Sequence, residues 1–245
     1  MQTEQILTAM VEFADTLINH FDVDDFLHRL CERCVEVFDV SSAGVSLASA
    51  VGVLAVAAGS DPTVELVERL QAETQEGPSR EVFYSGVQVV EPNLHTTGLR
   101  RWPRFAPAAL EAGVPAAVFV FPLRLREERI GALALFRGDP GPFDHAEVRA
   151  AQALADIATI GILQARAIAE KKNLTSQLQQ ALDSRVLIEQ AKGMVAAHGS
   201  LAMRDAFEQL RLHGRRTGRS LRDVAQDVVD GSLILPRSHS IPKAR

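Results

Sequence analysis

The sequence predicts an α+β domain, then one long connecting helix, then an all-α module of short helices at the C-terminal end. Three observations carry this fold class. Helical, strand-like and irregular segments follow one another over roughly 140 residues and end in an apolar hairpin. A stretch without proline then keeps helical composition from Asp144 to about Ala197. Beyond it, two further amphipathic segments are separated by turn residues.

Two amphipathic helices are predicted at the start of the chain. Residues 4–20 and Asp22–Val40 both repeat apolar residues at helical spacing. Asp22, Asp24 or Asp25 would cap the second helix, because a side-chain oxygen there accepts from the free N–H groups of the first turn. We expect both helices to cover a sheet.

The strands of this sheet are predicted from short apolar runs. Ala43–Leu47 and Val51–Ala57 are β-compatible and have glycines nearby, which is typical of a hairpin. Val118–Leu125 and Ile130–Phe136 form a second hairpin around the polar turn 126–129. The second hairpin is apolar enough to be buried on at least one face.

The segment between the hairpins is predicted to be less regular. Apolar residues from Val64 to Leu70 return to helical spacing. After Gly77-Pro78 we expect a polar loop, a short strand at Val87–Val90 and a long irregular stretch that reaches Pro107.

The first part of the chain resembles a GAF domain. The matching segments are 76–94, 101–137 and 140–164, and the resemblance runs from roughly Val23 to Gln164. It implies a sensory fold with a central antiparallel sheet flanked by helices. Ser79 departs from the family, since many relatives carry cysteine there, and thiol chemistry is therefore not transferred to this loop.

A single helix is predicted from the N-cap Asp144 onward, with a length of roughly 80 Å at 1.5 Å per residue. Leu174, Leu178, Ala181 and Ile188 approximate the spacing of a coiled coil, which Arg185 interrupts. A coiled-coil linker and a solvated connecting helix both remain open.

Two further helices complete the C-terminal module. Ser200 or a near neighbour is expected to cap Met203–Leu212, and Thr217-Gly218 makes a turn. Ser220, with Asp223 three residues later, resembles a capping box for a helix at Leu221–Val229.

This module resembles an ANTAR domain. The matching residues are 188–193 (IEQAKG), Asp205 to Phe207 with Leu210-Arg211, and 220–228. The resemblance implies binding to paired short stem-loops with six-base loops in nascent RNA, so that a terminator cannot form. Gly214 departs from the commoner alanine, and because glycine costs about 1 kcal/mol in a helix, we expect the second helix to fray there.

These readings divide the chain into four parts. They are a GAF-like sensory domain at 1–164, a helical linker with coiled-coil spacing at 165–184, an ANTAR-like RNA-binding domain at 185–235 and a basic flexible tail at 236–245.

Charge is distributed unevenly along the chain. From residue 185 onward there are eleven Lys and Arg against six acids, so this part carries +5 and residues 1–184 carry −10. Such a split is typical of a module that binds a polyanion. The candidate RNA-binding residues are Arg185, Gln190, Lys192, Arg211, Arg215, Arg216, Arg219 and Arg222. A solvated basic surface is the alternative interpretation.

A small-molecule pocket and a redox pair are less clearly indicated in the first part of the chain. Tyr84, Trp102 and Phe105 would line a pocket suited to a small molecule, whereas the alternative is that Trp102 and Phe105 close the core under a loop. Cys31 and Cys34 form a CxxC on one helix face, and we favour ordinary buried residues over a redox pair.

No metal, cofactor or catalytic centre is predicted. The seven histidines are scattered singly, and the sequence lacks the GxSxG, P-loop and dinucleotide-type glycine patterns. With two cysteines, no export signal and no apolar run fit to cross a bilayer, we expect a cytoplasmic protein without membrane contact.

The leading hypothesis is a non-enzymatic regulator of transcription antitermination. Its expected partners are structured RNA stem-loops, a second copy bound through the long helix, and an unidentified small molecule. A DNA-binding regulator that uses the last two helices is the first alternative, although Asp223, Asp227 and Asp230 on the third helix would repel phosphates. A ligand-activated enzyme and a sensor that binds no nucleic acid are the others.

Overall fold

The computed structural model describes residues 2–17 and 21–235 of the chain. The predicted tail at 236–245 lies outside the described residues. The chain separates into two compact units, Met1–Ala167 and Ile168–Arg245.

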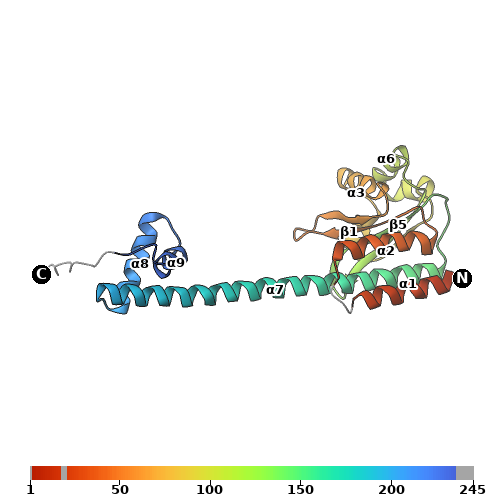
Figure 1. Cartoon of the computed structure of the whole chain (residues 1–245). Helices are drawn as coiled ribbons and strands as arrows, with labels where there is room; N and C mark the ends of the chain where they lie inside the picture. Colours follow the sequence, from red (N-terminus) through yellow and green to blue (C-terminus); the bar gives the residue numbers. More distant parts are fainter. Residues whose placement is uncertain (1, 18–20, 236–245) are drawn as a thin grey trace. The chain divides into compact units, whose positions relative to one another are not determined.

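The first unit alternates helices and strands as the sequence predicts. Its elements are α1 (Gln2–Thr16), α2 (Val23–Phe38), β1 (Ser42–Ala48), β2 (Leu54–Gly59), α3 (Thr63–Thr74), α4 (Pro78–Ser85), β3 (Val89–Glu91), η1 (Leu94–Gly98), α5 (Leu99–Arg101), α6 (Phe105–Glu111), β4 (Ala117–Leu125), β5 (Glu128–Arg137) and the beginning of α7 (His145–Gly199) (Figure 1).

A single five-stranded sheet lies at the centre of this unit, in the order β2-β1-β5-β4-β3. All four pairings are antiparallel. Both predicted hairpins are therefore confirmed, since β1 pairs with β2 and β4 pairs with β5. The longest strands, β4 and β5, are almost wholly buried up to the exposed turn that joins them, which accounts for their unbroken apolar runs.

Helices cover both faces of the sheet and enclose two separate cores (Figure 1). On one face α1, α2 and α7 pack against side chains such as Phe119 and Leu133. On the other face α3, α4, η1 and α6 pack against alternate residues of the same strands, such as Val118 and Val120. This alternation follows from the two-residue period of a strand.

Capping fixes where the helices of the first face begin. Of the three candidate caps for α2, Asp22 takes the role, because its Oδ1 accepts from the backbone N–H of Asp24 at 2.8 Å and of Asp25 at 3.1 Å. Asp144 caps α7 in the same way, accepting from the backbone N–H groups of Ala146 and Glu147. Both predicted starts are confirmed.

Two predictions for the second face are wrong. The stretch after Gly77 is not a polar loop but the helix α4, which begins at Pro78. Proline is tolerated there because an N–H group in the first turn of a helix has no acceptor within the helix. The stretch up to Pro107 is not irregular, because η1, α5 and most of the first turn of α6 lie in it. These helices are short and depend on packing against the sheet, so helical spacing in the sequence is weak.

The second unit contains the rest of α7, then α8 (Met203–Thr217) and α9 (Leu221–Val229). The three helices share an apolar core that includes Ala191, Val195, Leu210 and Val224. The predicted range of α9 and its Ser220 cap are confirmed, since Ser220 Oγ accepts from Asp223 N at 3.1 Å.

The predicted start of α8 at Met203 is confirmed, but its predicted capping residue and its predicted end need correction. Its N-cap is Ala202, which makes no side-chain capping bond, and not Ser200. The helix does not fray at Gly214 but continues to Thr217, because Gly214 is buried and its carbonyl accepts from Arg219 N at 2.9 Å. A Cβ at this position would lie 3.0 Å from the Arg219 carbonyl oxygen, so glycine allows α8 to approach the following turn closely.

Candidate functional site

The candidate basic residues of the second unit gather at the junction of α8 and α9. Arg215 and Arg216 lie in the last turn of α8, Arg219 follows Gly218, and Arg222 lies in the first turn of α9; all four arginines are exposed. Gly218 has φ +68°, a conformation that favours glycine, and this sharp turn brings the two helix ends together. Four guanidinium groups are thus presented within eight residues of chain.

A hollow of about 330 Å³ lies at this junction. Its lining combines three cations with three small or apolar residues: Arg211, Gly214, Arg215, Gly218, Arg219 and Leu221. Guanidinium groups donate hydrogen bonds in a planar fork that matches phosphate oxygens. The hollow is therefore suited chemically to an anion such as a phosphate group.

Some of the predicted cations are already paired with acids of the same unit. Lys192 pairs with Glu189, and Arg211 pairs with Glu208 at 3.1 Å, each within one helix. Arg219 pairs with Asp227 across the turn. The hydrogen bond from Arg219 lowers the pKa of Asp227, so this carboxylate stays ionised and competes with any incoming anion.

The remaining cations are free to meet a partner. Within the described ranges no ion pair engages Arg185, Arg215, Arg216 or Arg222. Gln190 is also exposed, on α7. The arginines on α7 and at the α8–α9 junction were found from charge counting, but which of them are paired is visible only in the fold.

Of the acids that count against a DNA-binding use of α9, Asp227 alone is paired with a cation among the described residues. Asp227 is paired with Arg219, and both carboxylate oxygens of Asp230 accept from Gln226 at 2.9 Å. Asp223 is exposed in the first turn of α9. The helix still presents more acid than base, because Arg222 is its single basic residue.

The three aromatic residues that were predicted to line a pocket of the first unit do not face a common cavity. Trp102 is 3% exposed and Phe105 is fully buried, and the two rings meet edge to face in the second core. Tyr84 is 59% exposed and lies under the guanidinium of Arg80. Trp102 and Phe105 therefore close the core, as in the alternative interpretation, while Tyr84 is a surface residue.

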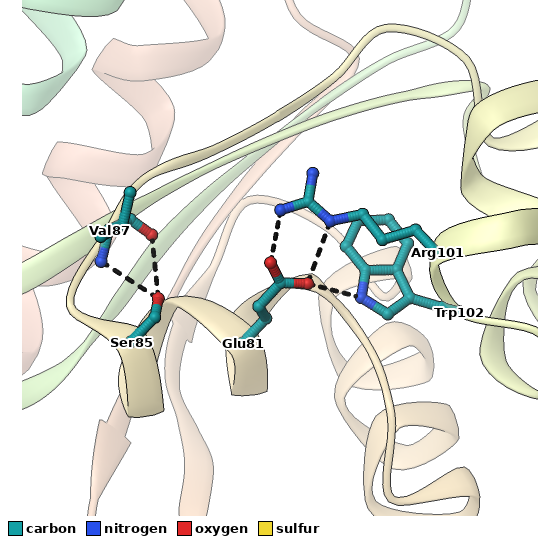
Figure 2. Close-up of polar contacts among 5 residues, drawn as sticks. All are labelled: Glu81, Ser85, Val87, Arg101 and Trp102. Carbon is teal, nitrogen blue, oxygen red and sulfur yellow. Dashed lines mark hydrogen bonds and ion pairs between the residues drawn. The ribbon is translucent and has the colours of Figure 1, made fainter.

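Glu81 holds Trp102 in this position (Figure 2). Its Oε2 accepts from the Trp102 indole Nε1 at 3.0 Å and from Arg101 Nε at 3.0 Å, while its Oε1 pairs with Arg101 Nη2. Arg101 in turn lies over the Trp102 ring, 5.0 Å from the ring centre. Sequence reasoning missed Glu81, because its partners are 20 and 21 residues away.

A buried polar cluster lies between β1, α3 and α4. Glu68 Oε2 accepts from Ser46 Oγ at 3.0 Å and from Gln71 Nε2 at 3.2 Å, and Gln71 Nε2 also lies 3.1 Å from Ser79 Oγ. Burial raises the pKa of Glu68. The signal in the sequence was Glu68 and Gln71 at helical spacing from Val64, on the buried face of α3. Ser79 contributes a hydroxyl to this cluster.

The two cysteines lie in the first core on α2 as free thiols. Both are fully buried, and burial raises the pKa of Cys31 to about 12. Burial also raises the pKa of Cys34 well above its usual value. A thiol that stays protonated is a poor nucleophile, so both residues act as small apolar side chains here. In the part of the chain that the structure describes, no group of three or more His, Cys, Asp or Glu is placed to hold a metal ion.

Comparison with known proteins assigns both parts of the chain. The family model of the GAF domain matches residues 21–163, and that of the ANTAR domain matches residues 176–229. A comparison with curated proteins gave no match.

Several solved structures share the fold of the first unit. The GAF domain of an Acinetobacter phosphoenolpyruvate-protein phosphotransferase is 14% identical, with a TM-score of 0.53, over 66% of this chain and 95% of that one. The corresponding domain from Coxiella burnetii is 14% identical, with a TM-score of 0.52, over 68% and 98%. Free methionine-R-sulfoxide reductase from Neisseria meningitidis is 16% identical, with a TM-score of 0.51, over 65% and 89%. At these identities the likeness concerns the fold alone.

Among the helices that the structure describes, none combines the length and the apolar character needed to span a bilayer.

Proposed function

The chain belongs to the GAF family, with an ANTAR domain following its GAF domain, and from this premise we propose that it is a signal-responsive regulator that binds stem-loops in nascent RNA and prevents transcription termination. The GAF domain receives a signal, and the ANTAR domain is the output. In this proposal the protein acts by binding and not by catalysis, and its setting is the cytoplasm.

The observation that carries the RNA-binding proposal is the arginine-lined hollow at the α8–α9 junction. Arg215 and Arg216 are exposed and have no ion pair among the described residues, so they lose no internal partner when they meet a phosphate. Arg219 must first leave Asp227. We therefore assign the largest contribution to the first two arginines, with Arg222 and Arg185 as further contacts.

The side-chain composition of the surface favours a folded RNA over an extended strand. Proteins that bind extended single strands stack bases on aromatic side chains. In the described part of the second unit the only aromatic residue is Phe207, which is half-buried. Contacts from guanidinium groups to the backbone of a stem, with Gln190 and Lys192 near the loop bases, fit this surface better.

We further propose that two copies associate through α7. Leu174, Leu178, Leu182 and Val186 follow one another at four-residue intervals and are 59%, 58%, 58% and 58% exposed. This stripe replaces the predicted seam, because Ile188 packs against the core of its own module. Water-exposed leucines at helical spacing are typical of a helix that pairs with another.

The position of the stripe leaves α8 and α9 free. Leu182 and Ala191 are nine residues apart, which is two and a half helical turns, and therefore lie on opposite sides of α7. Val186 and Val195 are related in the same way. Because Ala191 and Val195 pack against α8 and α9, a second copy on the stripe does not cover these helices. A dimer then offers two equal sites, as a pair of stem-loops requires.

The test is a gel shift with an RNA of two stem-loops with six-base loops, at several salt concentrations. Arg215→Glu with Arg216→Glu should weaken binding at least about tenfold and reduce the slope of log K against log salt by about 0.7 to 0.9 per lost phosphate contact. The control, Arg124→Glu with Arg126→Glu, makes the same charge change on the exposed β4–β5 turn.

Unchanged binding in the Arg215/Arg216 variant, or equal weakening in the control, would contradict the assigned surface. Competition with duplex DNA decides between nucleic acids. Displacement of the RNA by an equal amount of duplex would favour the DNA-binding alternative, and no binding to either would favour a sensor that acts on other partners.

A further inference from the structure

One side of the second core of the GAF domain is covered by a segment of short helices, which we call the roof. The roof consists of residues 94–112, in which η1, α5 and α6 follow one another. Leu94, Trp102, Phe105 and Ala109 point from it into the core. The other walls come from α3, α4 and the sheet.

The two ends of this roof meet at one place. The backbone N–H of Leu94 donates to the carbonyl of Ala116 at 2.7 Å, where β4 begins. Residues between these two points therefore form a closed loop that leaves the sheet and returns to it at nearly the same position. Compact surface loops whose ends lie close together are frequently functional.

Two carboxylates tie the roof to the opposite wall. Glu81 on α4 binds Arg101 through both oxygens and accepts from the Trp102 indole (Figure 2). Glu76, which precedes α4, accepts from Arg104 Nε and Arg104 N, both at 2.8 Å. Glu76 Oε2 also accepts from the backbone N–H of Phe105 at 3.4 Å. Both acids come from residues 76–81, and all four of their partner residues come from residues 101–105.

The arginines of these ties lie at the surface, whereas the tryptophan beneath them is buried. Arg104 is 64% exposed and Arg101 and Glu81 are each 37% exposed, while Trp102 directly below is 3% exposed. Charge pairs at such sites are readily exchanged for water. The roof is thus held by two kinds of contact. Its apolar contacts are costly to expose to water, whereas its ion pairs and hydrogen bonds can be replaced by contacts with water.

We propose that residues 94–112 form a lid over the second core, that Glu76 and Glu81 hold it shut, and that its opening withdraws Trp102 and exposes apolar surface between the sheet and α4. The lid goes beyond the proposed RNA-binding function, because it concerns how the sensory domain changes state.

Hydrogen exchange of the full chain, read by mass spectrometry, tests the lid. Glu76→Gln with Glu81→Gln removes both charges and keeps the shape of the side chains. Backbone amides of residues 95–112 should then exchange about tenfold faster, while those of β4 and β5 are unchanged. The control, Glu73→Gln with Glu127→Gln, removes two exposed acids of the same domain and should leave both regions unchanged.

Trp102 provides a second readout, because it is the single tryptophan of the chain. Quenching of its fluorescence by acrylamide should increase in the Glu76/Glu81 variant and not in the control. Should the double variant fail to fold, Glu81→Gln alone decides, since its amide oxygen still accepts from the indole. Equal exchange in variant and wild type overturns the lid, and so does faster exchange spread evenly over β4, β5 and α2.

Discussion

Gly131 occupies the tightest point between two strands of the GAF sheet, and replacing it by alanine should strongly destabilise this domain. A Cβ at Gly131 would lie 2.0 Å from the carbonyl oxygen of Ser46 and 3.1 Å from the Cα of Leu47. Ordinary van der Waals contacts of a Cβ atom lie at 3.4–4 Å. Since β5 is also paired with β4 at Leu123, it cannot move away from β1 without disturbing the other side.

The expected loss of stability follows from the separation of β1 and β5. Moving β1 and β5 apart by more than about 1 Å breaks roughly two ladder hydrogen bonds, at about 1 kcal/mol each, and shifts backbone in a packed core, which costs a further 1–3 kcal/mol or so. We expect Gly131→Ala to lower the free energy of unfolding by about 3–5 kcal/mol. At about 2 kcal/mol per molar urea, the midpoint falls by roughly 2 M.

Urea unfolding followed by Trp102 fluorescence is the assay, because the only tryptophan reports on the GAF domain and not on the ANTAR domain. The matched control is Gly138→Ala, at an exposed glycine just after β5 that has no atom within 4 Å of the added Cβ. The free energy of unfolding of this control should change by less than about 0.5 kcal/mol. Equal midpoints for Gly131→Ala and Gly138→Ala would refute the argument.

Three further predictions concern charge and assembly. Burial raises the pKa of Glu68 above 4.5, so its ionised form opposes folding at neutral pH; Glu68→Gln should raise the melting temperature at pH 8, with the gain shrinking towards pH 4.5. Asp227→Asn releases Arg219 and removes a negative charge, and RNA binding in gel shifts should tighten about two- to fivefold, where weaker binding would contradict the pairing argument. Leu182→Glu should shift sedimentation towards monomer, whereas Glu170→Gln, also exposed on α7, should not.

The sheet was predictable because its strands carry their own signal. β4 and β5 are buried on both faces, so the two strands are continuous apolar runs on either side of a polar turn. α9 was predictable in its full range because Ser220 and Asp223 mark its start and four apolar residues mark its inner face.

The roof and α4 were not predictable, because their order comes from tertiary contacts. The signal for α4 was Pro78 directly after Gly77, which is read as a turn when the residues that follow are polar. The ion pairs were equally hidden. Arg219 and Asp227 are eight residues apart, and Glu81 and Arg101 are 20 apart, so neither distance corresponds to a neighbour on one helix.

The continuity of α7 has a consequence for anyone who handles the ANTAR domain alone. The ANTAR match begins at residue 176, inside a helix that started at His145, so the domain has no cap of its own; the capping oxygen belongs to Asp144. A fragment cut at 176 would open with backbone N–H groups that have lost their carbonyl partners. Proteolysis or cloning at this boundary therefore removes no residue of the domain and still shortens its first helix. A capping serine or aspartate added to such a fragment should restore the missing start.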